Sequence, residues 1–411
     1  MEKRVLIFTN HFYPEYFKIN DVVDWFYSEN ITTSVVTSNP NYPKGRIFKG
    51  FSIFGSKKTH KSATVYRLPV IPRGGGNKLI LSLNYLSYFF SLFLFTFWLI
   101  ILHKKYDTLL IHHTSPPLLF LPALMYKKIK GSKVILWDLD MWPHTLSSVG
   151  IIKSKGLINF LEGLFKWFYK QFDHILLGSE SFKEFAQKRV NLKKTLYFPN
   201  WADLVFESQK PIARNFDPTK KIIISYTGNI GQAQDLESLV KAVKLSKNKN
   251  YEIRLIGDGR AKESLKSIVL AEGLNDQIKF YDSVDSQNLL GYYKESDFLY
   301  LSLNSSPLFS KTVPAKFQTY LASGVPIIGL ISGETNTLIR DNNLGFVSKA
   351  GDINGLSKIF DSLSKLQDPQ YQKMKSYCKD LYQSRFSSSL RKKDLLSYII
   401  DVNKNFITKH S

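Results

Sequence analysis

Short apolar runs alternate with longer stretches of helical periodicity along most of the chain. In the first half the apolar runs predict strands at Arg4–Thr9, Thr32–Thr37, Thr64–Leu68, Thr108–His113, Lys133–Asp138, His174–Gly178 and Thr195–Phe198. The stretches between them predict helices at Asn20–Glu29, Leu118–Lys130, Leu157–Gln171 and Ser181–Lys188. Because continuous apolar runs are typical of strands buried on both faces, this order predicts a mostly parallel sheet covered by helices.

A second alternating series begins after the polar stretch 209–221, which contains two prolines and predicts an interdomain linker. Its strands are expected at Ile222–Thr227, Glu252–Ile256, Ile278–Tyr281, Phe298–Leu301, Pro326–Leu330 and Gly345–Val347. Its helices are expected at Leu236–Ser246, Ala261–Ala271, Ser286–Glu295, Pro314–Ser323, Glu334–Asp341 and Ile353–Lys365. We therefore predict an α/β fold with two Rossmann-like doubly wound domains, residues 1–208 and 222–384, that face a central cleft, followed by a C-terminal helix over 385–411.

An uncharged run of 24 residues, Leu79–Leu102, interrupts the first series. About 20 apolar residues suffice to cross a bilayer. A single crossing would, however, separate the strand at 108–113 from the strand at 4–9, which we expect in the same sheet. Three polar residues of the run fall in one helical sector: Asn84, Ser87 and Ser91. We predict a monotopic helix that embeds its apolar face in one leaflet, with a wholly buried helix and a spanning helix as alternatives.

The net charge of +22 predicts an anionic partner. Lysines and arginines occur in short scattered groups, whereas nucleic-acid modules usually concentrate them along one element, so nucleic acid is disfavoured. Phospholipid headgroups and phosphorylated substrates remain as candidates for the anionic partner. The single cysteine, Cys378, excludes a disulfide within the chain.

Two glycine-containing turns follow predicted strands in the second half. The first is Gly228-Asn229-Ile230-Gly231 and the second is Gly257-Asp258-Gly259. Glycine allows the backbone to approach a phosphate closely, and a helix N-terminus behind such a turn offers free N–H groups. Each pattern is weak by itself, because a plain tight turn explains it as well.

The helix that Pro314 begins carries Lys316 in its first turn. The helix dipole disfavours a cation there, and a bound diphosphate would compensate for it. The alternative is a solvated surface lysine. Further along, Glu334 follows a buried strand and is suited to accept hydrogen bonds from sugar or ribose hydroxyls, although the first turn of a helix also favours a glutamate without any ligand.

Several segments, in this order and spacing, resemble the family 4 glycosyltransferases, and in particular the WbuB-like subgroup of L-N-acetylfucosamine transferases of O-antigen assembly. The matching segments run along nearly the whole chain: Phe12–Glu15, Asn39–Gly45, Thr114–Pro117, Asp138–Pro143, Gly228–Gly231, Gly257–Gly259, Pro314–Lys316, Ala322–Pro326 and Gly333–Glu334. The resemblance implies a GT-B fold, a hexosyltransferase reaction with retention of anomeric configuration, and no metal or other cofactor.

The resemblance also implies that the second domain binds a UDP- or GDP-sugar and that Lys316 clamps its phosphates. The donor-binding residues would be Gly228, Asn229, Gly231, Gly257, Asp258, Lys316, Thr319 and Glu334. Many relatives carry two glutamates separated by seven residues around this helix. The corresponding positions here are Lys311 and Thr319, so the usual carboxylate contact with the ribose is absent or replaced.

Candidate catalytic residues follow predicted strands of the first domain. Asp140 is the first candidate to orient or deprotonate the acceptor hydroxyl, and Asp138 and His113 are the next. In retaining chemistry the donor phosphate itself can take the acceptor proton, which leaves Asp140 to orient the acceptor. Acceptor-binding residues are expected in two of the matching segments, at Tyr13, Asn41 and Tyr42.

These observations predict a glycosyltransferase of O-antigen or capsule biosynthesis at the cytoplasmic face of the bacterial inner membrane, monotopic or peripheral. It would move a sugar, with N-acetyl-L-fucosamine the first candidate, from a nucleotide diphosphate to a polyprenyl diphosphate-linked saccharide. Its partners would be the nucleotide sugar, the lipid-linked acceptor and an anionic membrane surface, without nucleic acid. A nucleotide-sugar 2-epimerase is an alternative that the uncharged run disfavours, and the missing glutamates keep a non-catalytic membrane scaffold open.

Overall fold

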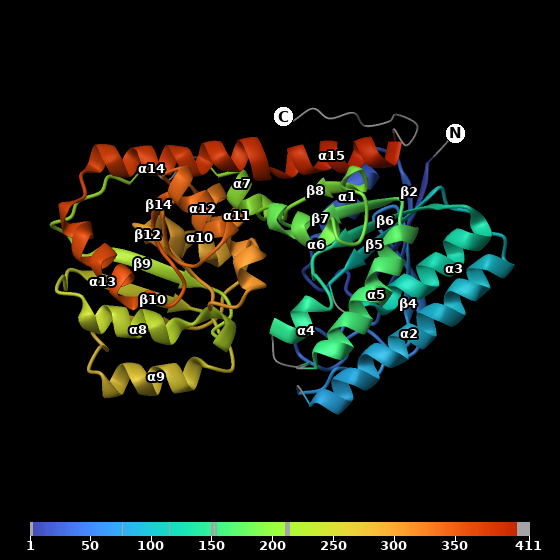
Figure 1. Ribbon diagram of the computed structural model, residues 1–411, viewed down its shortest axis with the longest axis horizontal. Coiled ribbons are helices and arrows are strands. Elements are labelled where there is room, and N and C mark those ends of the chain that lie inside the picture. The colour runs from blue at the N-terminus through green and yellow to red at the C-terminus, as the bar shows by residue number, and fades with distance from the viewer. Residues whose placement is uncertain are drawn as a thin grey trace. The chain divides into compact units, whose positions relative to one another are not determined.

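The computed structural model describes residues 3–75, 77–114, 116–148, 152, 154–209 and 214–400 (Figure 1). It divides the chain into two compact units, one made of residues 1–198 and 392–411 and the other of residues 199–391. The division lies before the predicted linker, residues 210–213 of which are outside the described part. Helix α7 (Leu204–Glu207) explains the difference, because its buried Phe206 stacks on Tyr293 of the second unit at 5.2 Å.

The first unit contains an eight-stranded sheet with the order β3-β4-β2-β1-β5-β6-β7-β8. Its strands are β1 (Arg4–Thr9), β2 (Thr32–Ser38), β3 (Ser56–His60), β4 (Ala63–Leu68), β5 (Thr108–His113), β6 (Lys133–Asp138), β7 (His174–Leu177) and β8 (Thr195–Tyr197). Its helices are α1 (Ile19–Ser28), α2 (Lys78–Ile101), α3 (Phe120–Lys130), α4 (His144–Ser148), α5 (Lys155–Gln171) and α6 (Lys183–Ala186). Strand β3, which the sequence pattern misses, is the antiparallel edge strand.

The second unit contains a six-stranded parallel sheet with the order β11-β10-β9-β12-β13-β14. Its strands are β9 (Ile222–Thr227), β10 (Tyr251–Ile256), β11 (Ile278–Tyr281), β12 (Phe298–Ser302), β13 (Ile327–Leu330) and β14 (Gly345–Ser348). The helices after α7 are α8 (Leu236–Leu245), α9 (Lys262–Ala271), α10 (Ser286–Glu295), α11 (Ala315–Ser323), α12 (Glu334–Asp341), α13 (Ile353–Ser362) and α14 (Asp368–Leu381). The strand order reverses between β9 and β12, where doubly wound sheets bind ligands.

The predicted α/β fold with two doubly wound, Rossmann-like sheets is therefore confirmed. The predicted C-terminal helix corresponds to α15 (Ser388–Ile400), and its residues from Lys392 onward group with the first unit. An ion pair of 2.7 Å between Lys392 Nζ and Glu29 Oε1 and an edge-on ring contact between Tyr398 and His174 attach this helix to that unit.

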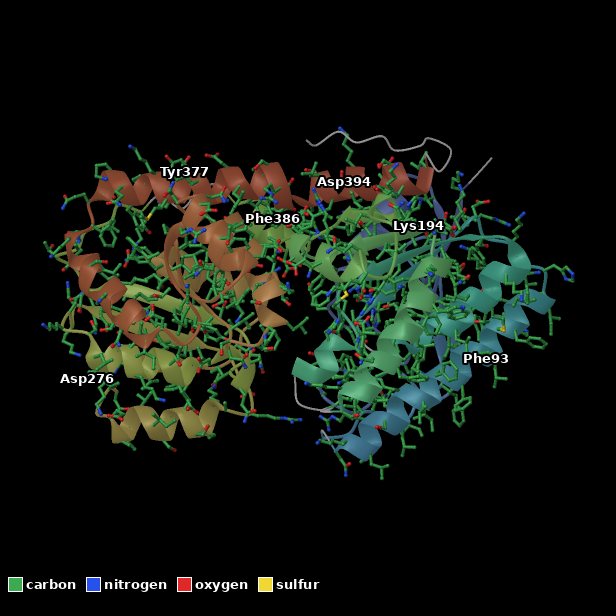
Figure 2. The ribbon with its side chains drawn as sticks, viewed as in Figure 1. Phe93, Lys194, Asp276, Tyr377, Phe386 and Asp394 are labelled. Carbon is green, nitrogen blue, oxygen red and sulfur yellow. The ribbon has the colours of Figure 1, made fainter. Side chains whose placement is uncertain are left out.

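Helix α2 covers the predicted uncharged run and packs against α3 and β4 of the first unit (Figure 2, where Phe93 marks the helix). Its buried residues form one stripe: Asn84, Tyr88, Leu92, Thr96 and Leu99. Its other faces expose large apolar side chains: Leu79, Leu83, Leu86, Phe90, Leu94, Phe97, Trp98 and Ile101. The alternative of a wholly buried helix is therefore wrong for this chain.

Polar side chains of α2 are satisfied inside the unit. Tyr88 Oη donates to the carbonyl of Thr9 at 2.7 Å, and Asn84 Nδ2 donates to the carbonyl of Ile71 at 2.5 Å. The predicted polar stripe thus faces the protein body. Among the described residues, α2 is also the one helix whose length and composition would allow it to cross a membrane.

Two neighbouring leucines test this orientation of α2. Leu92 is 0% exposed and Leu94 is 67% exposed. Leu92→Ala should lower the free energy of unfolding by about 2–5 kcal/mol, because it leaves a cavity in packed surroundings. Leu94→Ala should change that free energy by no more than about 0.5 kcal/mol. Chemical unfolding of both variants measures the difference, and equal losses would mean that α2 does not pack on the sheet through this face.

Candidate functional site

Two interlocked glycine turns form the floor of the candidate donor site in the second unit. The turn after β9 and the turn after β10 are joined by hydrogen bonds from Gly228 N to Ile256 O at 2.9 Å and from Ile230 N to Asp258 O at 2.8 Å. A Cβ atom on Gly257 would lie 1.9 Å from the Gly228 carbonyl oxygen, so no side chain fits there. Gly228 also has a φ of 120°, a conformation that favours glycine. Both glycines are needed for the two turns to approach each other.

Lys316 lies against this floor. It is the second residue of α11, and its Nζ is buried without a hydrogen-bond partner among the described residues. The ammonium lies 3.9 Å from the centroid of the Tyr226 ring, and a Cβ atom on Gly228 would lie 3.3 Å from Nζ. Burial lowers the pKa of Lys316 to about 7. The alternative of a solvated surface lysine is therefore wrong, and the structure brings Lys316 and Gly228 together.

The other predicted donor residues occupy the same edge of the sheet. Asn229 and Asp258 are exposed on the two glycine turns, and Asn229 Nδ2 donates to Gln234 Oε1 at 3.0 Å. Thr319 lies one turn after Lys316 on α11 and is half-buried. Glu334 begins α12 directly after β13, so it follows a carboxyl end of the parallel sheet, as Gly228 and Gly257 do.

The turn before Glu334 is held by close backbone packing. Gly333 has a φ of 73°, and a Cβ atom on it would lie 1.7 Å from the carbonyl oxygen of Ser310. Gly333 is therefore required in order to place Glu334 at the first position of its helix. This half-buried carboxylate lies at a helix N-terminus, which stabilises its charge.

In the first unit, His113 and Asp138 form a buried pair at the ends of the adjacent strands β5 and β6. His113 Nδ1 lies 2.8 Å from Asp138 Oδ1, and both side chains are 1% exposed. The other carboxylate oxygen of Asp138 accepts a hydrogen bond from Tyr169 Oη. Asp138 therefore orients the imidazole of His113. The imidazole Nε2 is buried and has no hydrogen-bond partner among the described residues.

Asp140 orders its own loop. Its Oδ1 accepts from Thr145 Oγ1 at 2.6 Å, and its Oδ2 accepts from Trp142 Nε1 at 3.2 Å. Each carboxylate oxygen keeps a further lone pair for a substrate hydroxyl. Burial raises the pKa of Tyr85 on α2, the charge of Arg73 opposes this rise, and the negative charge of Asp140 adds to it. The half-buried Asp140 thus lies near α2 and Tyr85.

The three predicted acceptor residues differ in their surroundings. Tyr13 and Tyr42 are exposed, and Tyr13 stacks on His60 with ring centroids 4.5 Å apart. Asn41 is buried, and its amide is used inside the unit, with Nδ2 donating to Asn39 O at 2.8 Å and Oδ1 accepting from Arg73 N at 3.2 Å. Asn41 therefore helps to hold its loop in place, and its contact with the acceptor stays a prediction.

Sequence reasoning missed two buried charged residues that support these loops. Glu15 accepts from the backbone N–H groups of Asn41 and Tyr42 at 2.8 and 2.7 Å and lies 2.9 Å from His11 Nδ1. Arg189 donates to both carboxylate oxygens of Glu162, at 3.0 and 2.8 Å, and to the carbonyl of Trp142 at 2.6 Å. Arg189 thereby fixes the segment that carries Asp140. No local pattern marks it, because its partners lie far away in the sequence.

Comparison with known proteins gives a family match for the second unit. The family model described as "Glycosyl transferases group 1" matches residues 208–380. The probable glycosyltransferase WbjE of Pseudomonas aeruginosa is 24% identical over 306 residues, which cover 72% of this chain and 75% of that protein. The putative colanic acid biosynthesis glycosyl transferase WcaI of Escherichia coli K12 is 23% identical over 338 residues, which cover 78% of this chain and 81% of that protein.

Solved structures match the fold over nearly the whole chain. Sucrose-phosphate synthase from Thermosynechococcus elongatus superposes with a TM-score of 0.73 and 13% identity, covering 98% of this chain and 99% of that one. HepE of Anabaena, in complex with UDP and glucose, superposes with a TM-score of 0.65 and 12% identity, covering 97% of this chain and 100% of that one. These solved structures therefore show that the fold is GT-B.

The buried amine of Lys316 predicts a pH-dependent stability. Its pKa is about 7 in the folded protein and 10.5 in an unperturbed lysine. Between these values the unfolded chain binds more protons, so the stability of the wild type should rise as the pH rises from about 7 to about 10. Lys316→Met removes the buried cation and should raise the free energy of unfolding at pH 7 by about 1–4 kcal/mol. Unfolding at several pH values measures both effects.

The same variant should lose affinity for UDP by about ten- to a hundredfold, the typical value of a hydrogen bond to a charged group. In the wild type, UDP affinity should fall by up to about tenfold per pH unit above pH 7, because binding requires the protonated amine. Lys241→Met, at an exposed position of α8, serves as the matched control and should change neither quantity. Calorimetric titration with UDP and uridine tests this, and an equal loss for both ligands would exclude a phosphate contact.

Proposed function

We propose that this protein is a retaining glycosyltransferase that moves a sugar from a nucleoside diphosphate to a polyprenyl diphosphate-linked saccharide in the synthesis of a bacterial surface polysaccharide. The observation that carries the proposal is the unpaired, buried amine of Lys316 at the point where the strand order of the second sheet reverses. It lies inside the segment that matches the group 1 family model.

The donor would bind with its diphosphate between Lys316 and the glycine turns. The leaving nucleotide gains negative charge on its diphosphate, and a fixed cation and free N–H groups at the start of α11 stabilise that charge. We infer that these groups make a divalent metal unnecessary. UDP is the first candidate nucleotide, because HepE, which shares the fold, binds UDP and glucose, and GDP is the second.

The acceptor would be bound and activated by the first unit. We propose that Asp140, whose Oδ1 is held by Thr145, orients the acceptor hydroxyl, with His113 as a second candidate. The name of the relative WcaI, a putative colanic acid biosynthesis glycosyl transferase, supports a role in polysaccharide synthesis. We propose a WbuB-like hexosyltransferase, with N-acetyl-L-fucosamine as the first sugar to test.

The apolar face of α2 supports a monotopic position at the cytoplasmic face of the inner membrane. Helix α3 packs on α2, and its Phe120 contacts Phe165 and Phe168 of α5 edge-on, so the three helices are neighbours. Helix α5 adds an exposed apolar row at helical spacing: Leu157, Phe160, Leu164 and Trp167. Continuous exposed apolar surface of this kind is typical of membrane or protein contacts.

A transfer assay tests the function. The full-length protein should transfer a sugar from a UDP- or GDP-sugar to a polyprenyl diphosphate saccharide, in the presence of EDTA as well. Asp140→Asn should lower kcat by about a hundredfold, the typical contribution of a positioned acid or base, while the dissociation constant for UDP stays unchanged. Thr145→Val, which removes a hydrogen bond to Asp140 but no charge, should have a much smaller effect. Interconversion of the donor sugar without transfer would instead indicate an epimerase, and no turnover with any donor would indicate a scaffold.

A vesicle-binding experiment tests the position at the membrane. The triple variant Phe90→Ser, Leu94→Ser and Phe97→Ser replaces exposed side chains of α2 and should release the protein from vesicles of phosphatidylglycerol and phosphatidylethanolamine without lowering its stability. The double variant Leu245→Ser and Leu270→Ser changes exposed leucines of the second unit and should remain bound. Co-sedimentation measures this, and retention of the α2 variant on vesicles would contradict the proposed contact.

A further inference from the structure

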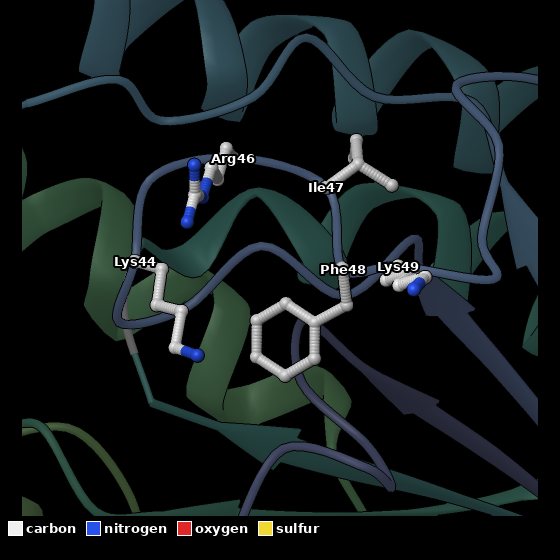
Figure 3. Close-up of a pocket in the computed structure, with 5 residues that line it drawn as sticks. All are labelled: Lys44, Arg46, Ile47, Phe48 and Lys49. Carbon is white, nitrogen blue, oxygen red and sulfur yellow. The ribbon is translucent and has the colours of Figure 1, made fainter.

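A cationic loop in the first unit surrounds a cavity of about 520 Å³. The residues that line it are consecutive or nearly so: Lys44, Arg46, Ile47, Phe48 and Lys49 (Figure 3). Lys44 Nζ lies 5.9 Å from the centroid of the Phe48 ring. Within the described ranges, none of the three cations forms an ion pair with a carboxylate. Three unneutralised charges within six residues repel one another, so an anion at this loop would stabilise it.

The surrounding sequence contains no acidic residue. Between Glu29 and Asp107 the chain has eleven lysines and arginines and neither aspartate nor glutamate. The positive potential of the loop is therefore not cancelled by neighbours in this segment. Arg46 adds a planar group that matches phosphate oxygens in a bidentate manner.

A second, apolar cavity of about 320 Å³ lies along the same stretch of chain. It is lined by Ile53 and Phe54 of the loop, by Ile71, and by Ser87 and Ser91 of α2. The two serine hydroxyls are already used, since Ser91 donates to Pro69 O at 2.8 Å and Ser87 accepts from Ile71 N at 3.0 Å. With these hydroxyls engaged, the groove presents mainly the exposed apolar side chains of Ile53, Phe54 and Ile71.

The cationic cavity and the apolar groove are held next to each other. Ile53 follows Lys49 by four positions, which limits their Cα atoms to about 14 Å apart. Gly74 N donates to Gly45 O at 2.8 Å, which ties the cationic loop to the segment that leads into α2. A Cβ atom on Gly45, whose φ is 73°, would lie 2.0 Å from Gly74 O, so glycine is required for this contact.

We propose that residues 44–54, with Ile71 and the middle of α2, bind the lipid part of the acceptor: the diphosphate in the cationic cavity and the adjoining isoprene units in the apolar groove. The inference rests on the proposed function and assigns the site where that lipid-linked substrate is held. A phospholipid headgroup offers a phosphate too, but a diphosphate brings more negative charge to the three cations.

Titration of the full-length protein in neutral detergent tests the site directly. The ligands are farnesyl diphosphate, farnesol and inorganic diphosphate, and all variants carry Lys316→Met in order to remove the other candidate anion site. Farnesyl diphosphate should bind more tightly than either of the other two. The double variant Lys44→Gln and Lys49→Gln should weaken the binding of both farnesyl diphosphate and inorganic diphosphate by about ten- to a hundredfold. The double variant Ile53→Ser and Phe54→Ser should weaken the binding of farnesyl diphosphate and leave the affinity for inorganic diphosphate unchanged.

Lys57→Gln with Lys105→Gln removes two exposed lysines from the same acid-free segment and serves as the matched control. Equal losses in this control would overturn the site, because they would show a diffuse charge effect. Unchanged binding of farnesyl diphosphate in the Lys44 and Lys49 variant would also overturn it. If that variant instead loses only its binding to phosphatidylglycerol vesicles, the loop contacts the membrane surface and not the acceptor.

The transfer assay separates this inference from the proposed function. With Lys316 intact, the Lys44 and Lys49 variant should raise KM for the polyprenyl diphosphate acceptor by about tenfold and leave the UDP dissociation constant unchanged. If this variant transfers sugar with an unchanged KM for the acceptor, the proposed function is supported and the proposed lipid-binding site is wrong. If farnesyl diphosphate binds at the loop but the protein shows no transfer activity, the site is supported and the proposed function is wrong.

Discussion

The buried amine of Lys316 is the interaction on which the candidate donor site depends. The face of the Tyr226 ring lies 3.9 Å from it, and no residue in the described part of the chain gives it a hydrogen bond. Burial raises the pKa of Tyr226 far above the physiological range, so its hydroxyl stays neutral and offers no counter-charge. The glycine turns keep the space beside Nζ free of side chains. A buried cation of this kind is energetically unfavourable until an anion binds.

The parallel strands could be predicted well because they are buried on both faces and therefore read as short apolar runs. Strand β3 could not, since it is an edge strand with the polar sequence Ser-Lys-Lys-Thr-His and pairs with only one neighbour. The division between the units was placed too late for a similar reason. A short helix, α7, lies in a polar stretch, and only its packing through Phe206 shows that it belongs to the second unit.

The candidate site was predicted where a local rule applies. Lys316 was found because a proline begins its helix and the dipole disfavours a cation there. Its burial could not be foreseen, since Tyr226 is 90 positions earlier in the sequence and meets Lys316 only through the order of the strands. The pairing of His113 with Asp138 also depends on two adjacent strands ending together. The burial of Asn41 depends in part on a distant contact as well, since its amide oxygen accepts from the backbone N–H of Arg73.

Helix α2 reverses the usual polarity of a surface helix. Its buried stripe carries Asn84, Tyr88 and Thr96, whose polar groups are satisfied inside the unit, while its exposed faces carry leucine and aromatic side chains. In water such a helix would leave a large apolar area unburied, and hydrophobic burial contributes about 25 cal/mol per Å². This penalty is the physical reason for proposing that a lipid leaflet covers α2.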